Sequence, residues 1–259
     1  MKHGNGYSGV VALTAGGPHA WIMINALREA YGEFPVLMED GEDAGAFWAR
    51  RRRRLGGLTV LSMRAAQILM KLTKPLSRGR VPDLIKTYGL HPEPNPDQSI
   101  IQIRDVNSER CRDLLRSIGP KAVFVVSTRM IRKDTLACVD APFINYHSGI
   151  NPAYRGMYGG YFALANGEPE HFGATVHLVD TGVDTGGILY QTTAEPTRKD
   201  NFHTYLWLLA AKSRDMVVRA IDDALGDRLQ AYTVDLPSRQ WFAPTLGGYL
   251  KAGVTRGVW

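Results

Sequence analysis

Short apolar runs recur along the chain, and turn-forming or helical segments separate them. The first run, 10–14, is rich in valine and leads into Ala15-Gly16-Gly17-Pro18, which predicts a buried strand, a glycine turn and a helix from about His19. Further strands are predicted at 34–38, 100–103, 122–126 and 143–147, with helices at about 107–118 and 133–139. Uninterrupted apolar strands that alternate with helices are typical of a parallel sheet covered on both faces. The sequence therefore predicts an α/β fold, with a Rossmann-like parallel sheet and helices on both of its faces.

Other segments complete the predicted organisation. Residues 43–88 form a helix-rich insertion, and 201–226 is predicted to be one long amphipathic helix. We expect a catalytic domain over 1–227 and a small C-terminal extension over 228–259, which packs on the domain through its aromatic side chains. Two more strands are predicted around a loop of Gly and Asp, at 174–179 and 188–192.

Composition narrows the class of protein. Hydrophobic residues make up 44% of the chain and charged residues 22%, which excludes a mainly disordered or fibrous protein. The start of the sequence lacks the charged-then-apolar layout of a signal peptide, and no apolar run reaches the roughly 18 residues of a membrane span. Cys111 and Cys138 follow no metal-ligand spacing and fit a reduced protein of the cytoplasm. We therefore expect a cytoplasmic protein without a metal.

The net charge of +6 has two local sources, Arg50 to Arg54 and the stretch 71–86. Such a surplus suits an anionic small molecule, an acidic membrane surface or nucleic acid about equally well. The ordinary interpretation of the arginine run is a solvated helix face. The alternative is a peripheral contact with a membrane.

Polar side chains gather where predicted strands end. Asn145 and His147 close one strand, the loop 151–156 follows, and the loop 180–187 carries two carboxylates among three glycines. Ligands of open α/β sheets sit at the carboxyl ends of strands, so these groups could supply acid–base and oxyanion chemistry.

Each of these features also has a structural interpretation. Asn145 and His147 can be turn residues bonded to backbone, and 180–187 can be a plain hairpin loop. The Gly16-Gly17 pair can hold a phosphate or simply make a turn. His177 alternates with apolar neighbours in a strand, which favours a buried structural histidine.

Four motifs follow one another within 143–191. They are Asn145-x-His147, Tyr154-Arg155-Gly156, Gly173-x-Thr175-x-His177 and Asp184-x-Gly186. In this order they resemble the core of the folate-dependent formyltransferase family, and the likeness extends over about 98–227. One departure is local: the family commonly has Pro-Ser after the histidine, where this chain has Ser148-Gly149. That exchange affects the shape of the loop.

The resemblance implies a reaction and a catalytic set. A formyl group passes from 10-formyltetrahydrofolate to a primary amine, and negative charge develops on the formyl oxygen. The Asn145 amide and a protonated His147 would stabilise that oxygen, where one well-placed donor contributes about 3–4 kcal/mol. Asp184 would favour the charged imidazole and, with a water, carry the proton from the attacking amine towards the folate nitrogen. No metal is required.

The resemblance also implies two binding regions. The folate would lie between a wall formed by Arg129, Met130 and Ile131 and the loop that contains Asp180 and Val183. On the acceptor side, we expect contacts from Tyr154, Arg155 and Tyr158.

The acceptor is left open among several amines. The insertion at 43–88 and the segment Tyr158-Gly159-Gly160-Tyr161 resemble formyltransferases of O-antigen and other surface-polysaccharide pathways, whose acceptors are nucleotide-linked amino sugars, with GDP-perosamine as the first candidate. A tRNA acceptor is disfavoured because the stretch after Gly226 is too short for an RNA-binding barrel, so no nucleic acid partner is expected. A ribonucleotide acceptor is disfavoured because the Gly16-Gly17 turn lacks the serine-bearing phosphate loop, while an amino acid acceptor stays open.

Two further alternatives concern partners. The same fold could serve as a non-catalytic scaffold that uses Arg50 to Arg54 to dock on a membrane or an assembly complex. A homodimer is a further expectation, with the aromatic residues of 228–259 as interface material.

Overall fold

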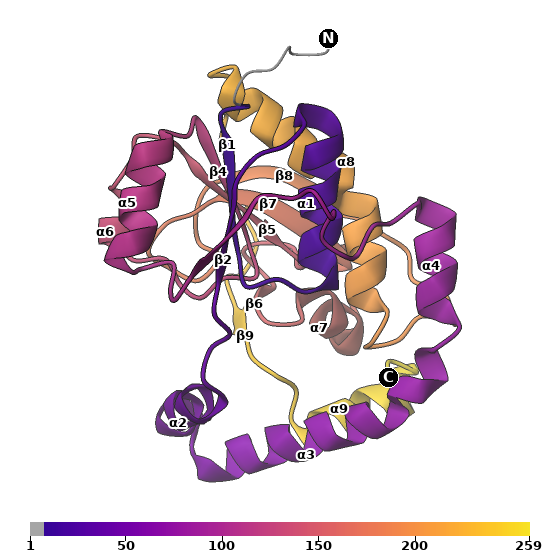
Figure 1. The fold of residues 1–259 in the computed structure, drawn as a ribbon. Helices are drawn as coiled ribbons and strands as arrows, with labels where there is room; N and C mark the ends of the chain where they lie inside the picture. The colour runs from indigo at the N-terminus through magenta and orange to yellow at the C-terminus, as the bar shows by residue number, and fades with distance from the viewer. Residues whose placement is uncertain (1–7) are drawn as a thin grey trace.

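A seven-stranded sheet organises the chain (Figure 1). The structure is a computed structural model that describes residues 8–259. Residues 1–7 lie outside the described residues. They are the first part of the expected 1–227 domain and most of the segment that we expect not to be a signal peptide. The strand order is β3-β2-β1-β4-β5-β7-β8. The strands are β1 (Val10–Thr14), β2 (Val36–Glu39), β3 (Ile100–Ile103), β4 (Ala122–Val126), β5 (Phe143–His147), β7 (Gly173–Leu178) and β8 (Ile188–Thr193).

The predicted α/β fold is confirmed, and the direction of its last two strands is a refinement. β1 to β5 pair in parallel, whereas β7 runs antiparallel to both β5 and β8. His147 at the end of β5 lies opposite Thr175 near the start of β7. The chain therefore folds α7 (Gly159–Asn166) near the carboxyl end of β5 and enters β7 from that same end. A crossover to the opposite end, which a parallel strand needs, does not occur there.

Helices cover both faces of the sheet. Because side chains alternate along a strand, Val10 and Ala12 of β1 join the core under α1 (Pro18–Tyr31) and α8 (Tyr205–Leu225). Their neighbours Val11 and Leu13 join the core on the opposite face. That face is covered by α5 (Glu109–Ile118) and α6 (Lys133–Leu136), and Figure 1 shows the two layers on either side of the strands.

The stretch between β2 and β3 is helix-rich. It contains α2 (Ala44–Leu55), α3 (Gly57–Thr73), the 3₁₀ turn η1 (Lys74–Ser77) and α4 (Arg80–Tyr88). α3 lies below the sheet in Figure 1, beside the C-terminal helix α9 (Leu246–Arg256). Ala66 and Met70 of α3 share a core with Tyr161 of α7 and Tyr249 of α9.

The C-terminal segment returns to the sheet's carboxyl edge. A two-residue strand, β9 (Gln240–Trp241), pairs in parallel with β6 (Arg155–Gly156). A short 3₁₀ turn, η2 (Pro169–His171), precedes β7.

None of the helices within residues 8–259 is long and apolar enough to cross a membrane.

Candidate active site

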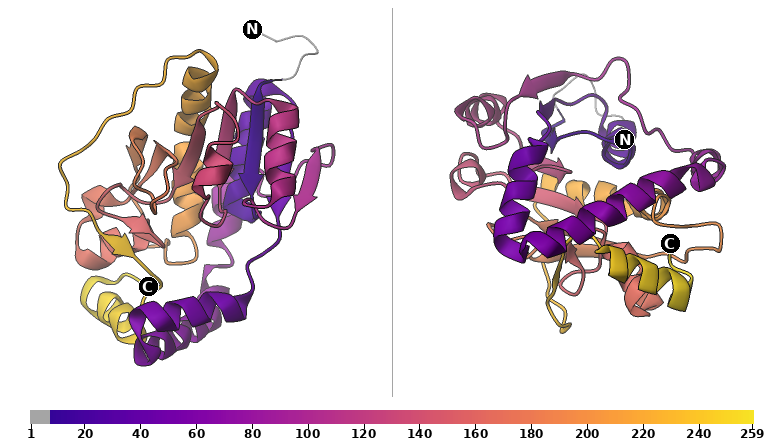
Figure 2. Two further views of the ribbon diagram at one scale, coloured as in Figure 1. Left: turned by 90° about the vertical axis from the view of Figure 1, so that its left-hand side faces the viewer. Right: turned by 90° about the horizontal axis from the view of Figure 1, so that it is seen from below.

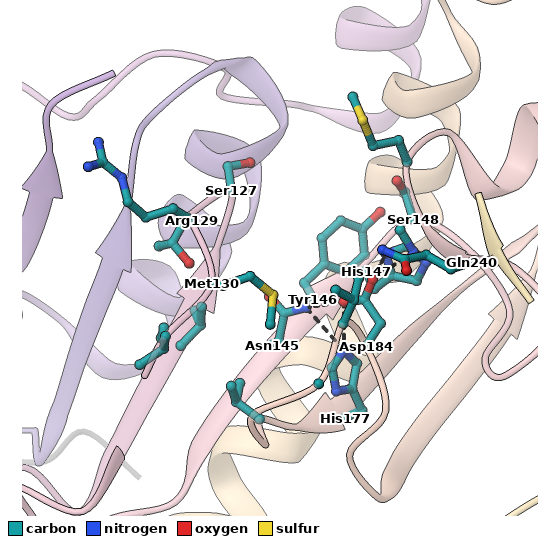
Figure 3. Close-up of a pocket in the computed structure, with 18 of the residues that line it drawn as sticks. Ser127, Arg129, Met130, Asn145, Tyr146, His147, Ser148, His177, Asp184 and Gln240 are labelled. Atoms are coloured by element: carbon teal, nitrogen blue, oxygen red, sulfur yellow. Dashed lines mark hydrogen bonds and ion pairs between the residues drawn. The ribbon is translucent and has the colours of Figure 1, made fainter. Parts of the chain in front are cut away.

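A cavity of about 350 Å³ opens where β4 and β5 end. Its lining comes from the segments after β4, at the end of β5 and after β7, with additions from α1, α2 and the C-terminal segment. In a doubly wound sheet the crevice at the carboxyl ends of the strands is the usual ligand site. Figure 3 shows Asn145, His147, His177 and Asp184 grouped on one side of this cavity, with Ser127, Arg129 and Met130 on the other.

Asp184 is the centre of a polar cluster. Its Oδ2 accepts a 2.8 Å hydrogen bond from the Gly156 amide and lies 3.5 Å from His147 Nδ1. Its Oδ1 lies 3.3 Å from His177 Nε2 and accepts a 3.4 Å contact from the Asn145 amide. The three residues expected to be catalytic, Asn145, His147 and Asp184, are thus brought together.

The surroundings of Asp184 favour its ionised form. Burial alone would raise the pKa of Asp184, but the neighbouring His147, the hydrogen bond from His177 and the Gly156 amide outweigh it and hold the pKa of this carboxyl well below its usual range. The backbone of Asp184 has a φ of 51°, in the left-handed region that non-glycine residues seldom adopt. Contacts on both carboxylate oxygens, from His177 on one and from Gly156 and His147 on the other, hold the side chain in place.

His147 is held between two oxygens. Its Nε2 lies 2.7 Å from the Tyr154 carbonyl, and its Nδ1 faces Asp184. A ring that carries protons on both nitrogens can donate to both oxygens. At 3.5 Å the contact with Asp184 is too long for a strong hydrogen bond, so the His147 ring is held mainly by the Tyr154 carbonyl.

Gly149 explains how the loop closes on the histidine. A Cβ at Gly149 would lie 2.5 Å from His147 Nε2 and would overlap the Tyr154 carbonyl. The Ser148-Gly149 pair therefore lets the backbone approach the imidazole directly. The departure from the family's pattern keeps the Asn145–His147 pair and changes the wall beside it.

The expected buried histidine at position 177 is confirmed, and the structure adds a contact with the polar cluster around Asp184. The side chain is buried, as a strand position predicts, and its Nδ1 lies 2.7 Å from the Leu178 carbonyl. Its Nε2, however, faces Asp184 and the Asn145 amide, at 3.3 and 3.1 Å. His177 belongs to the polar cluster because β7 pairs with β5 and sets His177 opposite Asn145. Antiparallel pairing of these strands is the signal that the sequence did not provide.

The residues expected to bind folate border the cavity. Met130 and Ile131 line it after β4, and Asp180 and Val183 line it after β7. Arg129 also lies in the wall, but its guanidinium points to protein acids, with Glu39 at 3.0 Å and Asp105 at 2.9 Å. Burial raises the pKa of Glu39, with amide hydrogen bonds from Arg129 and Val106 opposing the shift. The Arg129 side chain and backbone N–H therefore both bind acids of the protein and fix the wall.

The acceptor-binding expectation needs a correction at Tyr154. Its side chain is 1% exposed, and its hydroxyl donates to Glu168, so this ring does not reach a substrate. Arg155 donates to the Val183 carbonyl at 2.7 Å and joins the Asp184 loop to the C-terminal segment. Tyr158 is half-buried against Phe202. Contacts from Arg155 and Tyr158 to an acceptor stay predictions.

Several lining residues were not found from sequence. Arg51 lines the cavity from α2 and stacks on Phe242 at 4.5 Å, and Trp241 lines it from β9. His19 lines it from α1, with its Nε2 2.6 Å from Ser127 Oγ. Nothing distinguishes Arg51 from the other members of its run, because only the fold shows which of them turns inward.

Comparison with known proteins places these motifs in a family. A family model described as formyl transferase matches residues 78–236. A methionyl-tRNA formyltransferase of Halothermothrix orenii is 30% identical over 125 residues, covering 48% of this chain and 39% of that protein. A methionyl-tRNA formyltransferase of Thermodesulfovibrio yellowstonii is 30% identical over 178 residues, covering 64% of this chain and 54% of that protein. The chain spans about half the length of these relatives or less.

Solved structures share the fold. A sugar N-formyltransferase from a Shewanella species superposes with a TM-score of 0.56 at 15% identity, over 89% of this chain and 75% of that one. An N-formyltransferase from Helicobacter canadensis, solved with folinic acid and dTDP-3-aminofucose, gives a TM-score of 0.53 at 13% identity, over 90% of this chain and 69% of that one. At these identities the likeness is one of fold.

Proposed function

Because the chain belongs to the formyl transferase family, we propose that it transfers a formyl group from 10-formyltetrahydrofolate to the primary amine of a nucleotide-linked amino sugar. The observation that carries this proposal is the cluster of Asn145, His147 and Asp184 at the cavity. The carboxylate contacts both other side chains through separate oxygens, at 3.4 and 3.5 Å.

The cavity suits the donor. A flat heterocycle with an apolar face and a hydrogen-bonding edge needs apolar walls and a few polar groups. Val125, Ile131 and Val179 supply apolar wall, and Ser127, Thr128 and Asp180 supply polar groups. When bound, the folate would supply the activated formyl group.

The chain's own residues would handle charge and protons. The Asn145 amide would donate to the formyl oxygen, and its contacts with His177 and Asp184 already orient it. His147 lines the cavity and, in its protonated form, would be the second donor to the formyl oxygen. Asp184, ionised at neutral pH, would with a water carry the proton from the attacking amine to the folate nitrogen, whose bond to the formyl carbon breaks as the new amide forms.

Features around the mouth of the cavity support an acceptor that carries a diphosphate and a ring. Arg51 supplies a cation and Trp241 an indole to the lining. Guanidinium groups pair with phosphates and stack on planar rings. The Helicobacter neighbour was solved with a folate and a dTDP-linked amino sugar, which agrees with this choice. GDP-perosamine is the first candidate, in the synthesis of an O-antigen or another surface polysaccharide.

A second acceptor is favoured by a specific observation. The relatives at 30% identity are methionyl-tRNA formyltransferases, so methionyl-tRNA is the leading alternative. Amino acids and ribonucleotides are the remaining amine acceptors, and a non-catalytic scaffold is the remaining alternative of another class.

An acceptor panel separates these functions. Purified protein with 10-formyltetrahydrofolate is offered GDP-perosamine, dTDP-linked 3-amino and 4-amino sugars, glycinamide ribonucleotide, amino acids and methionyl-tRNA, and products are read by mass spectrometry for one added formyl group. We expect formylation of a nucleotide sugar. Formylation of methionyl-tRNA alone would mean that the reaction is correct and that the acceptor is tRNA. Absence of both folate binding and formylation would favour the non-catalytic scaffold.

A further inference from the structure

Helix α3 exposes an apolar face to solvent. Its inner side chains, such as Val60 and Met63, are buried against the protein. A helix that is apolar all round is normally buried on every side. The outer face of α3 nevertheless carries exposed aliphatic side chains, namely Leu58 (85% exposed), Leu61 (65%), Ile68 (62%) and Leu72 (72%).

Helix α9 carries further exposed apolar side chains next to α3. α9 lies beside α3, and Figure 2 shows both helices on the same side of the molecule, with α2 at one end. Leu250 and Val254 of α9 are exposed at successive turns of that helix, and Val254 is 79% exposed. Most of the large apolar side chains that are exposed within residues 8–259 come from α3, α9 and the C-terminal residue. We call this surface the α3/α9 face.

The α3/α9 face is also cationic. The sequence contains no Asp or Glu from 44 to 82 or from 236 to 259, while Lys and Arg recur in both stretches. The exposed cationic side chains of these two helices include Arg64, Lys71 and Lys251, and Arg52 and Arg53 are exposed on α2, which contacts α3. Arg64 and Lys71 lie between the exposed leucines of α3 itself.

We propose that the α3/α9 face docks on the surface of a bilayer that contains anionic lipids. Apolar side chains flanked by Lys and Arg are typical of helices that lie in the membrane interface. The aliphatic groups would enter the headgroup boundary, and the cations would meet lipid phosphates. One partner then contacts both the aliphatic and the cationic side chains of the surface.

Charge and chemistry disfavour two other occupants. A second copy of the chain would bring its own α3/α9 face, and two helix pairs that carry cations and no acidic side chains would repel each other at contact distance. An RNA would pair with the cations, but its phosphate backbone offers no apolar surface to the four exposed aliphatic side chains of α3. A bilayer interface offers both anionic phosphates and an apolar region.

Docking would orient the catalytic cavity. Arg51 and its neighbours Arg52 and Arg53 lie on one helix, α2. Arg51 turns inward and lines the cavity, while Arg52 and Arg53 are exposed. The cavity would therefore sit close to the bilayer surface.

Vesicle flotation tests the proposal with the full chain, without substrates. The probes are vesicles of phosphatidylcholine alone and of phosphatidylcholine with phosphatidylglycerol. We expect flotation with the anionic vesicles at about 0.1 M salt, and at least about tenfold weaker binding to the neutral ones. Failure of the wild-type protein to bind anionic vesicles would overturn the proposal.

Two pairs of variants test the two parts of the surface. Leu61→Ser/Ile68→Ser removes aliphatic contact, and its control is Tyr232→Ser, an exposed aromatic away from α3 and α9. The charge variant is Arg52→Glu/Arg53→Glu, and its control is Arg104→Glu/Arg110→Glu, two exposed arginines near β3 and on α5. We call the apolar variant and the charge variant the face variants. Each should bind anionic vesicles at least about tenfold more weakly than its control.

The remaining outcomes decide among partners. Unfolding curves establish that the variants are folded. Equal vesicle binding by face and control variants overturns the proposal, as does a wild-type dimer in sedimentation that Leu61→Ser/Ile68→Ser converts to monomer. Tighter binding to an unstructured RNA than to anionic vesicles, lost in the charge variant alone, replaces the bilayer with nucleic acid.

Discussion

At the scale of single residues, Asp184 carries the largest share of the proposed chemistry. Replacing it by Asn keeps the size of the side chain and removes the charge that faces His147 and His177. We expect Asp184→Asn to fold and to lose at least about a hundredfold in formyl transfer, since a positioned acid–base group contributes about 10²- to 10⁴-fold. Steady-state rates with saturating donor measure the loss.

The matched control for this variant is Asp215→Asn, an exposed carboxylate on α8 without a contact to the cavity. The control should retain the wild-type rate. An Asp184→Asn protein that is as active as the control would remove Asp184 from the mechanism.

His19 gives a prediction about pH. Burial lowers the pKa of His19 from 6.5 to about 4. A histidine with a depressed pKa is protonated more readily in the unfolded chain, so its contribution to stability is complete above pH 6.5 and is lost as the pH falls towards 4. Relative to His19→Gln, the wild type should lose about 1–3 kcal/mol of unfolding free energy over this range. Denaturant unfolding at several pH values measures it, and parallel curves for the two proteins would contradict the assigned environment.

At the scale of elements, the loop after β5 depends on Gly149. A Cβ there would meet His147 Nε2 at 2.5 Å and overlap the Tyr154 carbonyl, so the backbone must shift in Gly149→Ala. We expect a loss of about 1–3 kcal/mol in stability and a fall in turnover, because the shift moves the imidazole. Gly247→Ala on α9 is the control, since its Cβ would enter open space. Wild-type turnover in Gly149→Ala would show that the loop tolerates the shift.

The C-terminal segment is expected to act through Trp241. Its indole N–H donates to the Ala153 carbonyl at 2.9 Å, and its ring stacks on Phe162 at 4.4 Å. Trp241→Ala should cost about 1–3 kcal/mol of stability and raise the KM for the acceptor, while Trp241→Phe should keep the stacking and lose about 1 kcal/mol. Thermal unfolding and acceptor titrations test this, and an unchanged KM in Trp241→Ala would remove β9 from the acceptor site.

The pattern of apolar runs was sufficient to predict most elements. The strands at 100–103 and 122–126 and the helix capped by Ser108 occur where the sequence placed them, because each is bounded by a strong local signal. Strand direction was not predictable in the same way. Antiparallel pairing of β7 depends on where the chain crosses the sheet, and no local propensity encodes that choice.

At the scale of the whole molecule, the site combines residues that local sequence signals mark with residues that only the folded chain brings to the cavity. The grouping of Asn145, His147 and Asp184 was expected from the motifs that carry the family resemblance, and their catalytic roles stay predictions. Arg51 and Trp241 could not be predicted, since they reach the cavity from segments far apart in sequence that meet only in the folded chain. Tyr154 was misassigned because sequence proximity to the site does not reveal that a side chain turns into the core.

The central claim is that the formyl group passes to an amine. The most direct test uses 10-formyltetrahydrofolate labelled at the formyl carbon, with the full chain and a nucleotide-linked amino sugar, and follows the label by mass spectrometry. We predict that the label appears in an amide of the acceptor in proportion to the donor consumed, and that omission of the acceptor stops consumption. Label released only as formate at the same rate with and without the amine would mean that water is the acceptor and would contradict the account.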